Sequence, residues 1–253
     1  MKIYSYNVNG IRAAMRKGLI DWVREANPDV LLIQETKAQA EQIDEEPFKE
    51  LGYHCHWHSA EKKGYSGVGI ISKQKPDHIE IGSGIEYIDQ EGRIIRADFG
   101  DLSIMSVYIP SGSSGDARQD LKMKFLGGFQ AYCKSLLNEK PNLIIGGDFN
   151  ICHTEIDIHN PKSNKDTSGF LPEEREWVTA FLQEGFIDSF RQFHEGEVDR
   201  YSWWSYRANA RNNNKGWRID YMMASSALKD QLKDADIAPE AKHSDHCPVM
   251  IEV

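Results

Sequence analysis

The sequence predicts a single α/β domain, residues 1–253, in which two β-sheets pack together and helices cover them. Three observations support this fold class. Short runs of β-branched and aromatic residues recur along the whole chain, amphipathic helical patterns lie between them, and no stretch rich in Pro, Gly or Ser divides the chain. A chain of 253 residues can also bury a large core without disulfides.

The expected strands are the short apolar runs, taken in chain order. They are Ile3–Val8, Val30–Ile33, Gly67–Ser72, Ile94–Phe99, Ser103–Ile109, Leu143–Ile145, Ile219–Met223 and Pro248–Val253. Glycine-rich segments such as Ser111–Gly115 are expected turns between elements.

Two helices are expected between the strands. The first carries an apolar stripe at every fourth residue, namely Leu121, Phe125, Phe129, Cys133 and Leu137. The second begins at Leu171-Pro172-Glu173-Glu174, where a proline and two acids occupy the first turn. Its expected buried face consists of Trp177, Val178, Phe181 and Leu182.

The composition excludes several classes of protein. Charged residues make up 27% of the chain and the mean hydropathy is −0.57, which is typical of a soluble globular protein. No apolar run is long enough to span a bilayer, and the first residues lack the apolar segment of a signal peptide. The four cysteines lie far apart, which argues against a disulfide framework. We expect a cytoplasmic monomer.

The charge is unevenly distributed. The net charge is −9, but residues 201–219 contain four basic residues and no acid, so this segment carries +4. Five aromatic residues lie in the same segment, and basic residues interleaved with aromatic rings suit a surface that follows a DNA strand. A solvated loop beside an aromatic-rich strand explains the segment equally well.

Isolated polar residues follow several of the expected strands. They are Asn7, Asn9, Glu35, Tyr108, Asp148 and Asn150. Any one of them could be a turn former or a helix cap, but together they indicate one convergent site. In Gly146-Gly147-Asp148-Phe149-Asn150 we expect the glycines to allow a tight turn.

A second group of polar residues lies near the C-terminus. Asp245 directly precedes His246, and Asp220 is an acid that could orient this histidine. A carboxylate–imidazole pair with a separate carboxylate is the equipment of general acid–base catalysis, and the neighbouring oxygen-rich side chains suit Mg²⁺. Alternatively, Asp220 pairs with Arg218 and His246 belongs to the core.

The motifs in these segments resemble the exonuclease III family of apurinic/apyrimidinic endonucleases, within the DNase I-like phosphoesterases. The resemblance runs from residue 3 to about residue 250. It is carried by segments that include Asn7-Val8-Asn9-Gly10-Ile11-Arg12, Leu32-Ile33-Gln34-Glu35-Thr36-Lys37, Gly147-Asp148-Phe149-Asn150, Phe170-Leu171-Pro172-Glu173-Glu174-Arg175, Trp217-Arg218-Ile219-Asp220-Tyr221 and Ser244-Asp245-His246.

The resemblance implies a four-layer α/β sandwich, with two mixed β-sheets flanked by helices. It also implies a Mg²⁺-dependent DNA-repair phosphodiesterase, with Mn²⁺ as a substitute ion. Its partner would be double-stranded DNA that carries abasic sites or blocked 3′ ends. Such an enzyme incises 5′ to the abasic site and removes the 3′ blocking groups, and some relatives are 3′-to-5′ exonucleases. The sequence does not apportion these activities.

Residue roles are likewise implied by the resemblance. Asp148 would activate water, held by Asn7 and Asn150; His246, fixed by Asp220, would contact the phosphate; and Tyr108 would donate its hydroxyl. Glu35 would bind the metal, with Asp245 near a second position. When two metals are drawn, Asn7, Asp148, Asn150 and His246 also count as ligands.

Two departures concern the metal and the phosphate. Asn9 stands where some relatives carry an aspartate, and Ser111 replaces a longer amide in the phosphate-contacting loop.

We expect Trp203, Trp217 and Ile219 to form a pocket for the base-free sugar, and Arg207, Arg211 and Ser111 to contact DNA. In a regular strand Trp217 and Ile219 would face away from Asp220, so the backbone must bend or twist there.

The remaining motif is His54-Cys55-His56-Trp57-His58. Strand periodicity places its three histidines on one face, as in a zinc site, but no acid obviously completes a ligand set. We interpret them as a solvent-facing strand without a metal.

Two other functions are alternatives to a DNA-repair phosphodiesterase. They are a phosphatase for small substrates and a non-catalytic DNA-binding module.

Overall fold

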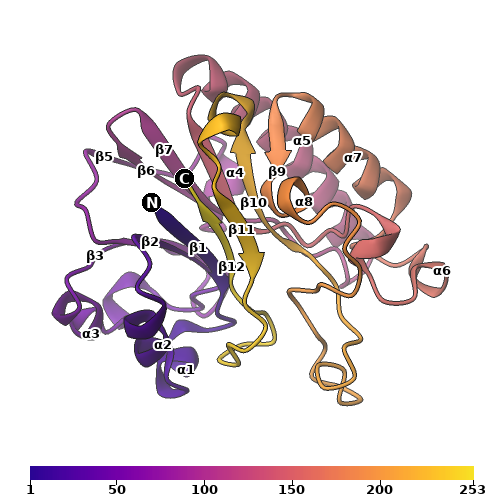
Figure 1. Ribbon diagram of the computed structural model, residues 1–253, viewed down its shortest axis with the longest axis horizontal. Coiled ribbons are helices and arrows are strands. Elements are labelled where there is room, and N and C mark those ends of the chain that lie inside the picture. Colours follow the sequence, from indigo (N-terminus) through magenta and orange to yellow (C-terminus); the bar gives the residue numbers. More distant parts are fainter.

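The chain forms two mixed β-sheets of six strands each, described for all residues 1–253 in a computed structural model (Figure 1). The first sheet has the order β11-β12-β1-β2-β4-β3. Its strands are β11 (Asp234–Ile237), β12 (Val249–Glu252), β1 (Lys2–Asn7), β2 (Val30–Gln34), β4 (Val68–Ser72) and β3 (His54–His58). Neighbouring strands are antiparallel except β1 and β2.

The second sheet has the order β5-β6-β7-β8-β10-β9. Its strands are β5 (His78–Ile81), β6 (Ile94–Phe99), β7 (Leu102–Tyr108), β8 (Leu143–Asp148), β10 (Asp220–Ser225) and β9 (Phe186–Asp188). Only β7 and β8 are parallel. Because both parallel pairs need crossover connections, helices are carried to the outer faces of the two sheets.

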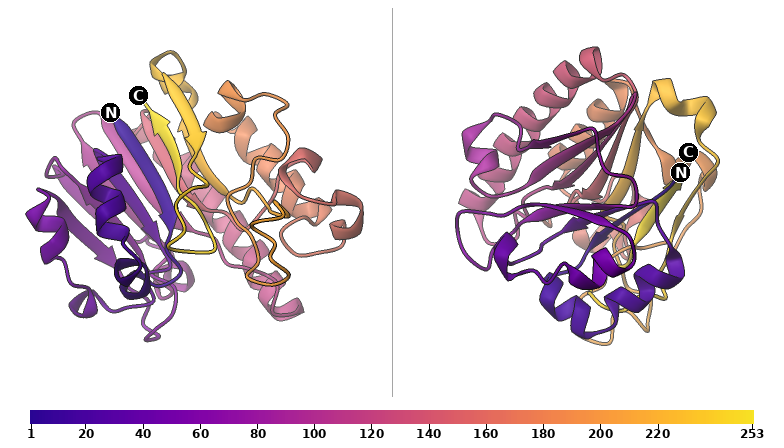
Figure 2. Two further views of the ribbon diagram at one scale, coloured as in Figure 1. Left: turned by 60° about the horizontal axis from the view of Figure 1, so that its bottom comes forward. Right: turned by 90° about the vertical axis from the view of Figure 1, so that its left-hand side faces the viewer.

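Helices cover the outer face of each sheet (Figures 1 and 2). On the first sheet lie α1 (Ile11–Arg16), α2 (Leu19–Ala26) and α3 (Glu46–Glu50), and on the second lie α5 (Asp116–Glu139) and α7 (Pro172–Gln183). The shorter helices are α4 (Glu86–Asp89), α6 (Pro161–Asn164) and α8 (Ser189–Phe193). A third apolar cluster fills the space between the sheets. The predicted four-layer sandwich is therefore confirmed.

The core between the sheets also contains a polar connection. The side chain of Gln34 donates to Ser106 Oγ at 3.0 Å, and Ser106 Oγ donates to the carbonyl of Ile33 at 3.0 Å. These bonds join β2 of the first sheet to β7 of the second. Buried polar groups that are fully paired specify one arrangement of the surrounding core. That the whole chain is one domain stays a prediction, supported by the core that both sheets share.

The expected elements are present, with shifted ends. The strand at β8 extends three residues beyond the predicted Leu143–Ile145, and the first helix begins at Asp116. A repeat of four residues drifts around a helix of 3.6 residues per turn, so Leu137 is only half-buried whereas Leu136 is buried. The edge strands β5, β9 and β11 were not predicted.

No helix combines the length and the apolar composition that a membrane-spanning segment needs.

The glycine pair before Asp148 does not form a turn, which corrects the sequence interpretation. Gly146 and Gly147 lie inside β8. A Cβ at Gly147 would lie 1.9 Å from the carbonyl oxygen of Val107, and one at Gly146 would lie 2.5 Å from Leu32 Cδ1. Close approach of the neighbouring strand and of the opposite sheet is therefore what requires glycine here.

Candidate active site

Strand ends from both sheets bring the predicted polar residues together at one edge of the sandwich. In the second sheet, Asp148 is the register partner of Tyr108 and of Asp220. In the first sheet, Asn7 is the register partner of Gln34, which places Glu35 beside it. The loops that carry residues 200–219 and 238–248 lie at the same edge, at the bottom of Figure 1. The site therefore depends on both sheets.

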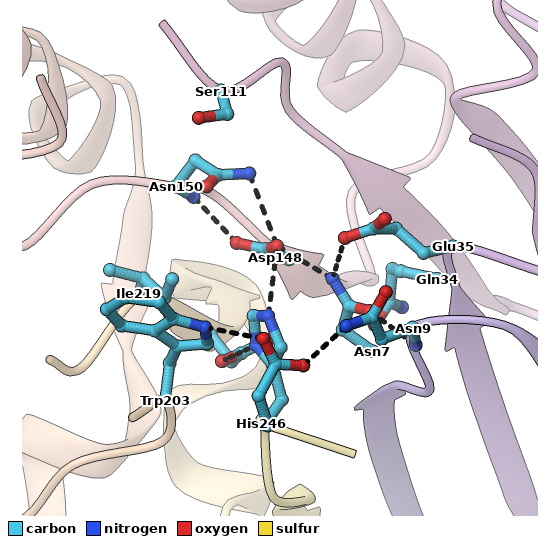
Figure 3. Close-up of polar contacts among 12 residues, drawn as sticks. Asn7, Asn9, Gln34, Glu35, Ser111, Asp148, Asn150, Trp203, Ile219 and His246 are labelled. Atoms are coloured by element: carbon cyan, nitrogen blue, oxygen red, sulfur yellow. Dashed lines mark hydrogen bonds and ion pairs between the residues drawn. The ribbon is translucent and has the colours of Figure 1, made fainter. Parts of the chain in front are cut away.

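Asp148 lies at the centre of this site, with 1% of its surface exposed. Asn7 Nδ2 donates to Asp148 Oδ2 at 2.8 Å, and Asn150 Nδ2 donates to the same oxygen at 3.2 Å (Figure 3). The backbone N–H of Asn150 donates to Oδ1 at 2.8 Å. Burial, together with the Asp220 and Glu35 carboxylates, raises the pKa of Asp148 to about 8 against the opposing charge of His246. A carboxylate with a pKa near neutrality is suited to take a proton from water.

His246 is held between two carboxylates. Its Nδ1 lies 2.9 Å from Asp220 Oδ2, and its Nε2 lies 3.8 Å from Asp148 Oδ2. Burial alone would lower the pKa of His246, but the charges of Asp220 and Asp148 outweigh it and raise the pKa to about 10. The ring is therefore an imidazolium near neutral pH and attracts an anion. It would have to lose a proton to bind a metal, because a metal ligand must be a neutral imidazole.

Asp220 is itself fixed by the segment around Ser202. Ser202 Oγ donates to Asp220 Oδ2 at 2.6 Å and accepts the backbone N–H groups of Ile219 and Asp220, both at 3.1 Å. The alternative pairing of Asp220 with Arg218 is wrong. Arg218 is fully buried and pairs with Asp157 and Asp188, each at 2.7 Å.

Glu35 extends into the site from a strained backbone. Its φ is +52°, a conformation that non-glycine residues other than Asn and Asp rarely adopt, and Asn150 nearby has φ +53°. Asn7 Nδ2 donates to Glu35 Oε1 at 2.9 Å, and Lys37 Nζ lies 2.8 Å from Oε2. Burial opposes ionisation, but Lys37 and then Asn7 hold the pKa of Glu35 below its usual value. The carboxylate is therefore charged and available to a cation.

Three of the proposed metal ligands come together. Glu35, Asp148 and His246 each offer one ligand atom, and these atoms lie within 4.8 Å of one another. Burial and then the neighbouring Asp220 and Glu35 carboxylates raise the pKa of Asp148, and a bound cation would neutralise the negative charge of this group. Carboxylate oxygens are ligands for a hard divalent ion, so the donor set fits a metal.

Asn7 and Asp245, two further predicted metal ligands, differ in their hydrogen-bond partners. The amide group of Asn7 bridges Glu35 and Asp148, while its oxygen accepts the backbone N–H of Asn9 at 3.0 Å. Asp245 accepts hydrogen bonds from Asn9 Nδ2 at 2.8 Å and from Trp203 Nε1 at 3.0 Å, and it lies outside the three-residue group. Asn9 thus links Asn7, beside Glu35 and Asp148, to Asp245.

A cavity of about 340 Å³ opens beside these residues. One wall is apolar and consists of Trp203, Trp217 and Ile219; another carries hydroxyl groups from Ser111, Ser113, Thr167 and Ser168. The two indoles meet edge to face, with ring centroids 6.0 Å apart. Trp217 and Ile219 share this cavity with His246 because β10 begins only at Asp220, so strand alternation does not apply to them. Isolated bridges hold Trp217 to Trp203 and to Ile158 instead.

Tyr108 also lines the cavity, from the end of β7. Burial and the neighbouring Glu35 carboxylate raise the pKa of Tyr108 well above its ordinary value. The phenol therefore keeps its proton over the physiological range and can donate it in a hydrogen bond.

The segment 201–219 is less basic at its surface than the sequence indicates. Besides the buried Arg218, Arg211 donates to the carbonyls of Ser244, Pro239 and Ala241 and lies over the Trp204 ring at 4.6 Å. Its guanidinium therefore secures the loop that leads to Asp245 and His246. Arg207 is exposed and lies outside the cavity lining.

The five aromatic residues of this segment lie in three environments. Tyr201 and Trp204 are buried in the cluster between the sheets, Tyr206 is exposed, and Trp203 and Trp217 line the cavity, as expected for the pocket. The sequence did not indicate that Tyr201 and Trp204 belong to the core, because they lie in irregular backbone without a period.

The histidine-rich strand β3 does not face solvent as expected. Only His54 is exposed, whereas His56 and His58 are half-buried and His58 Nδ1 lies 2.7 Å from the carbonyl oxygen of Ile94 in the other sheet. The group of potential metal ligands in this structure lies at Glu35 and not on β3.

Some residues of the site were not assigned to it from the sequence. Ser113, Thr167, Ser168 and Gly169 line the cavity from two irregular loops, although Ser168 and Gly169 begin the family motif that continues through Arg175. Lys37 was part of a recognised motif, but its ion pair with Glu35 depends on its own left-handed backbone, with φ +48°.

The fold and this constellation define a phosphoesterase, and comparison with known proteins places it among the nucleases. The sequence profile of the Endonuclease/Exonuclease/phosphatase family matches residues 4–246, and the chain belongs to this family. It is 46% identical over 250 residues to the exodeoxyribonuclease of Bacillus subtilis, covering 98% of both chains.

Solved structures agree with this assignment. An AP endonuclease from Archaeoglobus fulgidus has a TM-score of 0.91 at 29% identity and covers 99% of this chain and 98% of its own. The 3′ phosphatase NExo from Neisseria, bound to a product DNA hairpin, has a TM-score of 0.93 at 27% identity, with 100% and 98% covered. The exonuclease III-type family predicted from the motifs is confirmed.

Proposed function

We propose that the protein is a Mg²⁺-dependent DNA-repair phosphodiesterase that incises duplex DNA 5′ to abasic sites and removes 3′ blocking groups, with 3′-to-5′ exonuclease activity. The observation that carries this proposal is the position of Asp148 between two amides, facing the His246–Asp220 pair and Glu35, beside an aromatic-walled cavity. Relatives named as exodeoxyribonuclease, AP endonuclease and 3′ phosphatase support each of the three activities.

Each residue of the site has its own role in the proposed hydrolysis. Asp148 takes the proton of the attacking water, and the amides of Asn7 and Asn150 keep its carboxylate aimed at that water. The imidazolium of His246, oriented by Asp220, binds a non-bridging phosphate oxygen and stabilises the charge that develops there. The hydroxyl of Tyr108 donates to the phosphate or to the departing oxygen.

Glu35 and Asp148 are the residues best placed to hold the cation, with the amide group of Asn150 beside Asp148. Bound Mg²⁺, or Mn²⁺ in its place, would supply Lewis-acid stabilisation of the phosphoryl oxygens and of the leaving 3′ oxygen. Two carboxylates with amide neighbours suit these hard ions better than a soft metal.

The apolar wall of the cavity supports a preference for a base-free sugar. In this proposal an abasic deoxyribose lies against Trp203, Trp217 and Ile219, and a base on the same sugar would clash with the two indoles. The hydroxyl groups of Ser111 and Ser113 on the other wall are available to the DNA backbone. Arg207, exposed on the 201–219 segment, contributes charge toward the phosphates.

The function is proposed for a monomer in a reducing cytoplasm. All residues of the site come from one chain, and the four cysteines are free, three of them buried.

Gel assays with three matched substrates test the proposal. Purified protein with Mg²⁺ would be incubated with one duplex carrying an abasic site, one carrying a 3′-phosphate and one with a plain recessed 3′ end. We expect cleavage of all three, with the abasic strand cut once, 5′ to the site. Hydrolysis of a small phosphate ester with no cleavage of any duplex would instead identify a small-substrate phosphatase, and binding without hydrolysis would identify a non-catalytic DNA-binding module.

A further inference from the structure

Arg93 is a buried cation that the proposed mechanism does not use. It lies directly before β6 and only 1% of its surface is exposed. Taking a guanidinium out of water is costly unless its donors are paired. Three donors are paired: Nε binds Glu91 at 2.6 Å, Nη2 binds the hydroxyl of Tyr65 at 2.9 Å, and Nη1 binds the carbonyl of Tyr108 at 2.8 Å.

Arg93 contacts both the backbone and the ring of Tyr108. The backbone N–H of Tyr108 donates to the carbonyl of Arg93 at 2.9 Å, so Arg93 binds both backbone polar groups of Tyr108. The guanidinium carbon also lies 4.6 Å from the centre of the Tyr108 ring. A cation against an aromatic face attracts the ring and restricts its orientation. Backbone and ring of Tyr108 are thus fixed by a single side chain.

Arg93 is also joined to the loops at the rim of the site. Arg118, in the first turn of α5, binds Glu91 at 3.1 Å and donates to the Tyr65 hydroxyl. Tyr65 directly precedes Ser66 and Gly67, whose carbonyls accept the N–H groups of the segment that carries Glu35, namely Thr36 and Lys37. We define Tyr65, Glu91, Arg93 and Arg118 as the Arg93 cluster.

We propose that Arg93 is a positioning residue, which holds the Tyr108 hydroxyl at the phosphate and ties its position to the loops on which DNA would lie. This inference rests on the donor role proposed above for Tyr108. The competing explanation is that Arg93 only stabilises the fold, as the buried Arg96 on β6 does through Asp98. Arg96 provides a matched control, because it is a buried arginine three residues away whose guanidinium binds Asp98 and not Tyr108.

A double-mutant cycle tests the proposal. Arg93→Met, Tyr108→Phe and the double variant would be compared with the wild type in single-turnover cleavage of the abasic duplex at saturating Mg²⁺. Tyr108→Phe should lower the rate by about 10²-fold, as expected for loss of a proton donor. Arg93→Met should lower it by about 10-fold in the wild type but by less than about 2-fold when Tyr108 is already Phe, because residues that act as one unit are not additive.

The controls separate the two explanations. Arg96→Met should lower the melting temperature and change the rate by the same factor in both backgrounds. If Arg93→Met does not fold, as judged by circular dichroism, Arg93→Lys would replace it in the double-mutant cycle. The single ammonium group of lysine keeps the charge but cannot reach all three partners. Equal factors for the Arg93 variant in both backgrounds would overturn the positioning role. A wild-type rate for Tyr108→Phe alone would instead overturn the donor role of Tyr108, on which the inference rests.

Discussion

Replacing Trp217 by Ala separates a pocket wall from a core residue. The Trp217 ring is half-buried, faces the cavity and meets Trp203 edge to face. Because part of the ring is already exposed, its removal should cost at most about 2 kcal/mol of unfolding free energy. For a chain of this size that lowers the melting temperature by roughly 4–8 °C. Abasic incision should fall by roughly 10–200-fold, the scale of small apolar discriminations.

The assay compares Trp217→Ala with Trp177→Ala, a core tryptophan of α7 whose Nε1 donates to the carbonyl of Leu126 at 3.1 Å. Trp177→Ala should cost about 3–5 kcal/mol and depress all activities together. Thermal unfolding, abasic incision and 3′-phosphate removal would be measured on both variants. If Trp217→Ala loses stability as Trp177→Ala does and both of its activities decline in proportion, Trp217 is a core residue and the pocket assignment is refuted.

Four further substitutions test the site and the fold. Asp148→Asn should lower cleavage by about 10²–10⁴-fold with an unchanged circular dichroism spectrum, and turnover above about 1% of wild type would contradict its role as base. Glu35→Ala should raise the half-saturating Mg²⁺ concentration in abasic incision; an unchanged titration would remove Glu35 from the metal site. Arg207→Ala should reduce the salt dependence of DNA binding by about one unit of slope, and an unaltered slope would exclude a phosphate contact. Although burial opposes it, Arg218 and Arg191 hold the pKa of Asp157 below its usual value, so its stabilisation is present above about pH 4 and is lost as the pH falls. Asp157→Asn should therefore lower the unfolding free energy by about 3–5 kcal/mol at pH 7 and by less at pH 3, and an equal deficit at both pH values in urea unfolding would contradict this.

The sequence predicted the layers and the centre of the site because both depend on local patterns. Apolar runs predicted the inner strands. Polar residues at the ends of those runs, such as Glu35 and Asp148, predicted the group that meets at the sheet edge. The exposed edge strand β5 lacks a continuous apolar run and was therefore missed.

The sequence did not predict which side chains of an irregular segment are buried and which are exposed. Residues 201–219 allowed two interpretations, a DNA-following surface or a solvated loop beside a strand, and neither predicted that Arg218 lies between two buried acids and Trp204 in the core. Long-range pairing decides these positions, and it has no period in the sequence. The glycine pair in β8 was misinterpreted for the same reason, since what requires it is the opposite sheet and not a local bend.

Because the site lies where the two sheets meet, the molecule is suited to division into complementing fragments. A break in the exposed loop between Ser114 and Gly115 would leave Asn7, Glu35 and Tyr108 on one piece and the carboxylates of β8 and β10 on the other. Each sheet also takes strands from both pieces, since β12 pairs with β1 and β8 pairs with β7. Neither piece alone would contain a complete catalytic set, so cleavage of DNA would report directly on their association.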